Sequence, residues 1–289
     1  MKLLRSTLTV LKILAIAGGM SSCVEQKKGS ASIGSPSASE YSNLPMRWPD
    51  SKLPLRVYIA DEYHAEIDSY SLVAGKDLFQ QMMDKWNLAD SNHTFFDTTA
   101  DYSTANLEYP YHTDYGSGDN IIGIYKKSSS WFADIGSGVL AVTSYIITPM
   151  SGYMEMVKGD IIVNEAQFNF VIDSSDSSYG KYDLPSVLLH ELGHLIGLKH
   201  TSSYSIPSVM RPEIGHTDTH RNPYTYDVSS IQSLYNTSYS ALTTSALALS
   251  SEDDADKEPK YFQGYIELRA DGKCRHFLEG QLVDEHSAF

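Results

Sequence analysis

The sequence contains few cysteines, with only Cys23 and Cys274 in 289 residues. Two thiols allow at most one bond within the chain, so the fold cannot depend on a disulfide framework. It must depend instead on a hydrophobic core, for which 42% hydrophobic and 11% aromatic residues are sufficient. The length suits one main domain with attached segments.

Basic residues are also scarce, because 22 Lys and Arg stand against 36 Asp and Glu, giving a formal net charge of −14. An acidic surface repels phosphate groups. The charge therefore excludes a nucleic-acid-binding protein and a protein held to membranes by a polybasic surface, and we expect no nucleic-acid partner.

Long hydrophobic runs are missing as well. The apolar stretch from Leu8 to Gly19 is interrupted by a lysine and is too short for a stable transmembrane helix. Two basic residues precede it, and it ends in Met20-Ser21-Ser22-Cys23, which resembles a bacterial lipoprotein signal. Residues 1–22 are therefore interpreted as a signal peptide, and Cys23 as the site of lipidation. This predicts an exported, extracellular protein anchored in the cell envelope, in the outer membrane of a Gram-negative host; the alternative is a plainly secreted protein.

Composition divides the rest of the chain into segments. Residues 23–44 are rich in Ser and Gly and are predicted to be a flexible tether, which leads into a folded domain over residues 45–240. Residues 241–260 are Ser/Ala-rich and then acidic, as is typical of a linker. Residues 261–289 alternate around Asp271-Gly272 and predict a small hairpin of unknown role.

Hydrophobic periodicity predicts a mixture of strands and helices, the α+β class. The helix expected at 71–88 carries Met82 and Trp86 in an apolar stripe that should face the core. The expected strands are 53–60, 94–97, 120–126, 139–147 and 160–164, and the expected helices are 71–88, 183–198 and 226–235.

The most informative stretch runs from His190 to His200. His190 and His194 are four residues apart on the expected helix, so both imidazoles project from one face and can hold a single ion. Gly197 can take a positive φ, end the helix and turn the chain back, which lets His200 supply a third nitrogen. Three neutral His around zinc leave a fourth position open, as in catalytic sites. Glu191 is then placed to act as general base for a metal-activated water.

This pattern, His-Glu-x-x-His-x-x-Gly-x-x-His, resembles the zinc-binding motif of the metzincins, and Ser208-Val209-Met210-Arg211-Pro212 is similar to their Met-turn. Within the metzincins the chain resembles the matrixins, through Arg47-Trp48-Pro49, Gly159-Asp160-Ile161 and the helix Asp227–Tyr235. The resemblance implies a metzincin-like catalytic domain. Such a domain has a twisted mixed sheet, about three helices and a zinc cleft beneath the edge strand. Met210 would form an apolar floor below the zinc, and Val139, Leu140 and Ala141 would be the edge strand along which the substrate lies.

The sequence departs from the matrixin pattern at several positions. It has no Pro-Arg-Cys-Gly switch sequence, and we expect Cys274 to be a free thiol. The family's structural zinc is only half represented, by His112 and Asp114, because Val142 replaces a His. The resemblance also implies a calcium site through Asp134 and Glu165, although Asn164 replaces a carboxylate, and Ile214 stands where a Tyr is common.

These observations predict a monomeric zinc-dependent endopeptidase with one catalytic zinc, which binds a protein or peptide substrate and is attached to the membrane through a lipid on Cys23. One alternative is a non-catalytic, zinc-containing surface binding or scaffold lipoprotein. Glu191 argues against it, because a purely structural site needs no base. A second alternative is an astacin-like enzyme with Tyr224 or Tyr226 as an extra metal ligand.

Overall fold

The computed structural model describes residues 41–61, 63, 75–99, 103–104, 121–127, 132, 135–173, 180–201, 203, 205–216, 218–239 and 260–287. All of them belong to one compact unit, Ser35–Phe289. The expected signal peptide, Cys23 and most of the expected linker lie outside the described residues. Within the described part of the chain, no helix is both long and apolar enough to cross a membrane.

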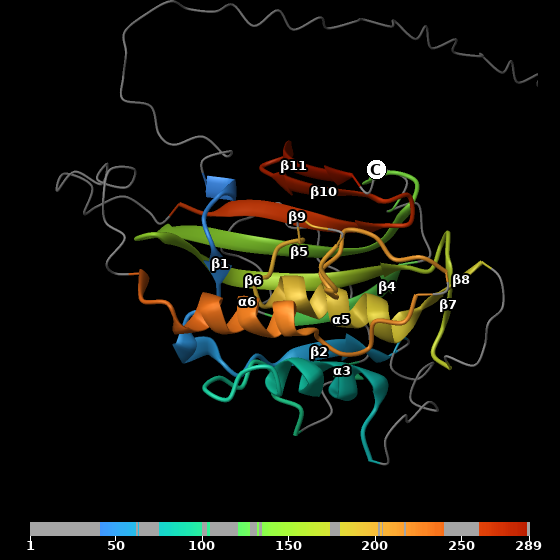
Figure 1. Ribbon diagram of the computed structural model, residues 1–289, viewed down its shortest axis with the longest axis horizontal. Coiled ribbons are helices and arrows are strands. Elements are labelled where there is room, and N and C mark those ends of the chain that lie inside the picture. The colour runs from blue at the N-terminus through green and yellow to red at the C-terminus, as the bar shows by residue number, and fades with distance from the viewer. Residues whose placement is uncertain are drawn as a thin grey trace, which may run out of the picture. The chain divides into compact units, whose positions relative to one another are not determined.

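The described strands form a nine-stranded mixed sheet and a separate two-stranded one (Figure 1). The large sheet has the order β11-β10-β9-β5-β6-β4-β2-β3, with β1 paired to β6, and β7 pairs with β8. Strands β2, β3 and β4 run parallel to their neighbours, whereas β5, β9, β10 and β11 form an antiparallel series. The strands are β1 (Met46–Arg47), β2 (Val57–Ala60), β3 (Ser103–Thr104), β4 (Ile122–Lys127), β5 (Val139–Met150), β6 (Tyr153–Asn164), β7 (Asn169–Val171), β8 (Lys181–Asp183), β9 (Phe262–Arg269), β10 (Lys273–Leu278) and β11 (Gln281–Ser287).

The described helices are α3 (Leu78–Asn87), α5 (Leu184–Leu195) and α6 (Thr225–Asn236). Figure 1 shows α5 and α6 in front of the sheet, with α3 beside β2. Helix α5 packs against α3 as well as against β5, β6 and β9. Helices gathered over a mixed, open sheet confirm the predicted α+β, metzincin-like fold class.

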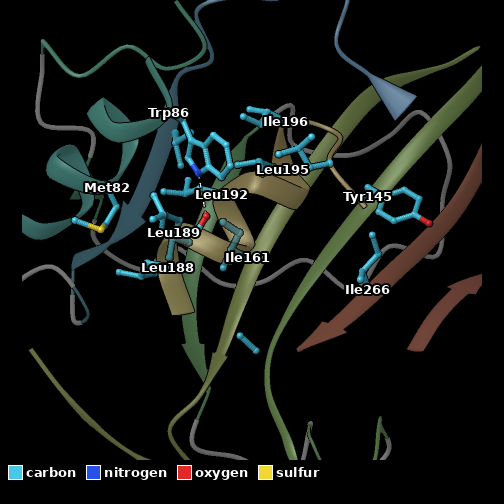
Figure 2. Packing of buried hydrophobic residues seen from close by; sticks show 14 of the residues in the cluster. Met82, Trp86, Tyr145, Ile161, Leu188, Leu189, Leu192, Leu195, Ile196 and Ile266 are labelled. Carbon is cyan, nitrogen blue, oxygen red and sulfur yellow. Dashed lines mark hydrogen bonds between the residues drawn. The ribbon is translucent and has the colours of Figure 1, made fainter. Parts of the chain in front are cut away.

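The main core lies between the sheet and the helices. The predicted apolar stripe of α3 is buried, with Met82 and Trp86 at most 2% exposed. Figure 2 shows Trp86 against α5, where its Nε1 donates to the carbonyl of Leu189 at 2.9 Å. Helix α3 begins at Leu78 rather than at residue 71, because Asp77 caps it and accepts a hydrogen bond from the backbone of Gln80.

A smaller apolar cluster lies on the opposite face of the sheet. Ile161 and Val163 of β6 belong to the main core, whereas Ile162 between them belongs to the second cluster. Because side chains along a strand alternate between the two faces, the clusters lie on opposite sides of the sheet. Both faces of β5 and β6 are therefore buried, which explains their nearly continuous apolar sequences.

The C-terminal segment differs most from the sequence prediction. Instead of a small hairpin that stands apart, residues 262–287 form the three strands β9, β10 and β11, which extend the main sheet. An isolated hairpin is marginally stable in water. Here β9 is stabilised by pairing with β5 and by burying Phe262, Ile266 and Leu268 in the main core.

The N-terminal boundary also differs from the prediction. Tyr41 is buried, and its ring lies 4.7 Å from that of Phe262 between centroids. The Nζ of Lys199 donates to the carbonyl of Ser42. The folded part therefore begins before residue 45, and residues 41–44 do not belong to a free tether.

Candidate metal centre and active site

Helix α5, which carries two of the three candidate metal ligands, is fixed at its N-terminus. The side chain of Asp183 accepts a hydrogen bond from the backbone of Ser186 at 3.1 Å, and Pro185 occupies the first turn. The guanidinium of Arg221 pairs with the same carboxylate. Capping satisfies N–H groups that have no partner inside the helix, so α5 begins at a defined residue.

The C-terminal end of α5 is held by side chains from distant parts of the chain. Trp48 Nε1 donates to the carbonyl of Leu195 at 2.7 Å, and the hydroxyl of Tyr235 donates to that of Ile196 at 3.0 Å. These donors pair with carbonyl groups that the last turn of a helix leaves unsatisfied. Every residue of α5 is buried, so the helix has little freedom to shift relative to the sheet.

Gly197 makes the turn that brings the third histidine back towards the helix. Its φ is +98°, a left-handed conformation that glycine adopts without steric cost. A Cβ atom at this position would lie 2.0 Å from the carbonyl oxygen of Met46. The turn therefore requires glycine both for its conformation and for the close approach of another backbone segment.

The three histidines converge through one nitrogen each. The Nε2 atom of His200 lies 3.2 Å from that of His190 and 3.0 Å from that of His194. The Nδ1 atoms of His190 and His194 lie 2.7 Å from the carbonyl oxygens of Val209 and Leu198, respectively. A carbonyl can only accept a hydrogen bond, so both Nδ1 atoms carry the proton and both Nε2 atoms present a lone pair.

Burial keeps these histidines neutral. It lowers the pKa of His190 to about 4, although the hydrogen bond to Val209 opposes the shift. Burial, followed by the neighbouring histidines, also lowers the pKa values of His194 and His200 well below the usual 6.5. Neutral imidazole is the form that binds zinc, so the ligands need not lose a proton at neutral pH.

The donor set fits a zinc ion. Among the described His, Cys, Asp and Glu side chains, His190, His194 and His200 form a group whose ligand atoms all lie within 4.8 Å of one another. Lone pairs directed at one point repel each other, and a cation at that point removes the repulsion. Three imidazole nitrogens, two of them on rings oriented by hydrogen bonds to backbone carbonyls, are typical of a catalytic zinc site.

Glu191 lies beside the histidines and is fully buried. Its Oε2 accepts a hydrogen bond of 2.5 Å from the hydroxyl of Thr143 on β5, whereas its Oε1 has no hydrogen-bond partner among the described residues. Burial raises the pKa of Glu191 to about 8, and the hydrogen bond from Thr143 opposes the shift. A cation held by the histidines would also favour the carboxylate.

The side chain of Met210 packs against α5 at Gly193. A Cβ atom at Gly193, between the two helical ligands, would be 2.4 Å from the Met210 sulfur. The turn itself is held by buried Asp227 of α6, which accepts hydrogen bonds from the backbone of Val209 at 2.9 Å and from the hydroxyl of Ser208. The anchored Val209 carbonyl in turn fixes the ring of His190.

Some residues that position this site have no role in the sequence prediction. Thr143, Gly193 and the indole of Trp48 act through contacts between segments far apart in the chain. The sequence prediction includes Asp227 only as part of the matrixin-like C-terminal helix. Its position ahead of an apolar helical repeat is the kind of signal that indicates a cap, but nothing local indicates that it also holds the Met-turn.

The predicted substrate strand is not at the edge of the sheet. Val139 pairs with Arg269 and Ala141 pairs with Leu268, with a bulge between them at Leu140. The prediction that these residues form an exposed edge is therefore wrong for this structure, because β9 occupies the side of β5 that a substrate would need. A pairing between segments more than 100 residues apart leaves no local signal in the sequence.

The other predicted metal sites stay predictions. Asp134, His112 and Asp114 lie outside the described residues, and the Glu165 carboxylate lies 3.7 Å from the Nζ of Lys126. Val142, which replaces the family's His, is buried in the smaller apolar cluster.

Two further side chains bear on the alternatives that the sequence left open. The hydroxyl of Tyr224, one of the residues weighed as an astacin-like ligand, lies 2.9 Å from the Nδ1 of His220. Tyr226 is exposed.

Cys274 is a free, buried thiol, as the sequence predicts.

Comparison with known proteins agrees with the geometry. The family model for matrixin matches residues 73–236, which is more than half of the chain and includes α3, β4, β5, β6, α5 and α6. No curated protein and no solved structure matches the chain. A matching family model and three converging histidines in the family's zinc-binding motif lead to one conclusion: the chain belongs to the matrixin family of zinc metallopeptidases.

Proposed function

We propose that the chain is a zinc-dependent endopeptidase in which Glu191 is the general base. The observation that carries this proposal is the buried carboxylate beside the three histidines, with one oxygen held by Thr143 and the other, Oε1, without a hydrogen-bond partner in the described part of the chain. A buried, unpaired carboxylate oxygen is costly, and such groups are retained where they act in binding or catalysis.

Zinc bound by the three histidines would polarise a substrate carbonyl and lower the pKa of a water molecule. Thr143 would hold the carboxylate of Glu191 in one orientation, so that Oε1 faces the reacting atoms. Glu191 would then accept the proton of the attacking water and deliver it to the leaving amine.

The substrate class that fits is an extended protein segment. Strand β5 offers backbone hydrogen bonds along the residues that β9 occupies in this structure, and an extended peptide in place of β9 would make the same kind of bonds. Backbone pairing depends little on side chains, so we expect unfolded proteins to be cleaved at more than one site.

A non-catalytic zinc protein is the alternative. A site built only for structure has four protein ligands and needs no carboxylate beside them. Three ligands next to Glu191 favour the peptidase.

We further propose that the chain is an exported lipoprotein attached to the cell envelope through Cys23. The sequence Met20-Ser21-Ser22-Cys23 supports this proposal. Incorporation of a labelled fatty acid, compared between the wild-type chain and Cys23→Ala, tests it. Equal labelling of the two proteins would exclude lipidation at this residue.

The test of the function is Glu191→Gln, which keeps the shape of the side chain but removes the base. We expect the variant to bind one zinc, as measured by metal analysis, and to lose cleavage of a labelled unfolded protein by a factor on the order of 10³ or more. A chelator should stop the wild-type enzyme. If wild type and variant cleave equally, Glu191 is not the base.

A further inference from the structure

Strand β9 fills the position in which an extended substrate would lie. It runs antiparallel to β5 along the whole segment from Val139, which pairs with Arg269, to Ile147, which pairs with Phe262. These pairs occupy the backbone groups on the side of β5 that faces away from β6. No second peptide can pair with this segment of β5 while β9 is in place.

The other side of β9 is also enclosed. Arg269 makes a parallel bridge with Glu213, which follows the Met-turn. The thiol of Cys274 on β10 donates to the carbonyl of Pro212 in the same segment. The C-terminal end of β9 thus lies between β5 and the chain that leaves the Met-turn.

The register places β9 opposite Thr143, the residue that holds the proposed general base. Thr143, whose hydroxyl binds the Glu191 carboxylate, pairs with Ile266 of β9, and Ile266 pairs with His276 of β10. Ile266 is 2% exposed, so the backbone at this point is packed against its neighbours. Water and substrate would have to displace this strand to reach Glu191 from this side.

Strands β10 and β11 turn polar side chains towards the histidines. Cys274 pairs with His286 across the two strands, so both lie on one face of the sheet. The ring of His286 meets the ring of His200 edge to face, with 5.8 Å between centroids. The C-terminal extension, β9 to β11, therefore contacts the candidate metal ligand His200 as well as strand β5.

A hydrogen bond that crosses β9 holds β9 and β10 close to β5. Tyr145 of β5 reaches across Gly264 of β9 to the Nε2 of His276 on β10. A Cβ atom at Gly264 would lie 2.4 Å from the Tyr145 hydroxyl oxygen and 2.6 Å from the carbonyl oxygen of Phe277. Glycine at this position allows the strands to approach each other so closely.

The same interface contains a group that weakens it. Glu267 of β9 is fully buried, and its Oε1 has no hydrogen-bond partner among the described residues, although its Oε2 lies 3.1 Å from Arg269. A strand that serves only as part of the scaffold gains stability when such a position is apolar, so the buried carboxylate suits a strand that has to leave.

We propose that Phe262–Ser287 is a built-in inhibitor, which occupies the substrate position on β5, lies against His200 and must be displaced before a protein substrate can bind. This inference rests on the proposed function, since it assigns a regulation to the same site. The extension is held by backbone pairing, packing and hydrogen bonds, none of them covalent, so its displacement is reversible.

The test uses the full chain with Leu268→Asp. Leu268 of β9 is fully buried, so the new carboxylate favours release of the strand. The matched control is Leu282→Asp, the same substitution on β11 at a side chain that is 50% exposed. Three quantities are measured on the zinc-loaded proteins: cleavage of a labelled unfolded protein, affinity for a fluorescent peptide hydroxamate, and amide hydrogen exchange in β5 and β6.

We expect faster exchange in β5 residues 139–147 of Leu268→Asp, with β6 still protected. Cleavage and hydroxamate affinity should both rise by a factor on the order of ten or more, because the open state becomes more populated. Leu282→Asp should match the wild type. If β5 exchanges faster in Leu268→Asp while hydroxamate affinity stays at the wild-type value, the extension does not cover the site and the proposal is overturned.

A different result separates this inference from the proposed function. If Leu268→Asp binds the hydroxamate more tightly than the wild type but neither protein cleaves any substrate, the extension covers the zinc site and the peptidase assignment fails. If Leu268→Asp also loses protection in β6, the fold is disrupted, and Gly264→Val replaces it. That variant displaces β9 through steric contact with Tyr145 and is judged by the same three measurements.

Discussion

Replacing Gly197 by alanine should reduce both the stability of the protein and its affinity for zinc. The φ of +98° costs a residue with a Cβ about 1–2 kcal/mol. The new Cβ would also lie 2.0 Å from the Met46 carbonyl oxygen, a distance at which one of the two segments must move by roughly 1 Å. Together these effects should lower the free energy of unfolding by about 2–4 kcal/mol.

The consequence for the metal site follows from the position of the turn. His200 is three residues after Gly197, and metal–ligand distances tolerate changes of only about 0.2 Å. A shift of the turn should therefore weaken zinc binding on the order of 10- to 100-fold, which is the range found when groups that orient a ligand are altered. Competition with a zinc-sensitive dye measures the affinity, and urea denaturation of the metal-free protein measures the stability.

Gly75→Ala separates the two contributions. Gly75 has a φ of +83°, but nothing lies within 4 Å of a Cβ built there. This variant should show the conformational cost alone, about 1–2 kcal/mol, with unchanged zinc affinity. Equal losses of stability in the two variants, with zinc affinity unchanged in both, would refute the claim that the approach of Met46 fixes the turn.

Two more predictions concern the proposed base and the extension. Thr143→Val in the Leu268→Asp background should lower kcat roughly 10- to 100-fold without loss of zinc, because a hydrogen bond to the charged Glu191 contributes about 1.5–3 kcal/mol; unchanged kcat would contradict this role. Burial first, and then Lys199 and His286, lower the pKa of His276 to about 3, so only the displaced extension gains a proton as the pH falls below about 6.5. The free energy that favours the docked extension is therefore largest above that pH and should fall by about 2 kcal/mol at pH 5. Burial raises the pKa of Glu267, so protonation of that residue at low pH favours the docked extension, in the opposite sense to His276. To isolate the effect of His276, hydrogen exchange in β5 is compared between wild type and His276→Asn at pH 7 and at pH 5. Equal pH dependence of the two proteins would exclude His276 as the cause.

The zinc helix could be predicted because its information is local. The spacing of His190 and His194, the apolar face of α5 and the turn at Gly197 all lie within a short segment, where the helical period alone decides which side chains share a face. The family resemblance then supplied the order of the remaining elements. The bounds of the helices differ from the prediction mainly at caps, as at Asp77.

The pairing of β5 with β9 could not be predicted in the same way. Alternation in β9 indicates a strand but not its partner, because any strand with one apolar face can extend any free edge. The pairing of Thr143 with Ile266 joins segments 123 residues apart, and it depends on Gly264 allowing Tyr145 to cross the strand. Likewise, the contact of Asp227 with the Met-turn depends on tertiary packing, so the local sequence does not predict it.

The contact between Tyr41 and Phe262 connects the two ends of the domain. Phe262 is the first residue of β9, so Tyr41 keeps its aromatic neighbour only while the extension is docked. Departure of β9 would uncover the Tyr41 ring and loosen the place where the chain enters the domain from its N-terminal side. A tension applied to that entry point would in turn favour release of β9, so an anchor on Cys23, as proposed above, would couple mechanically to the exposure of β5.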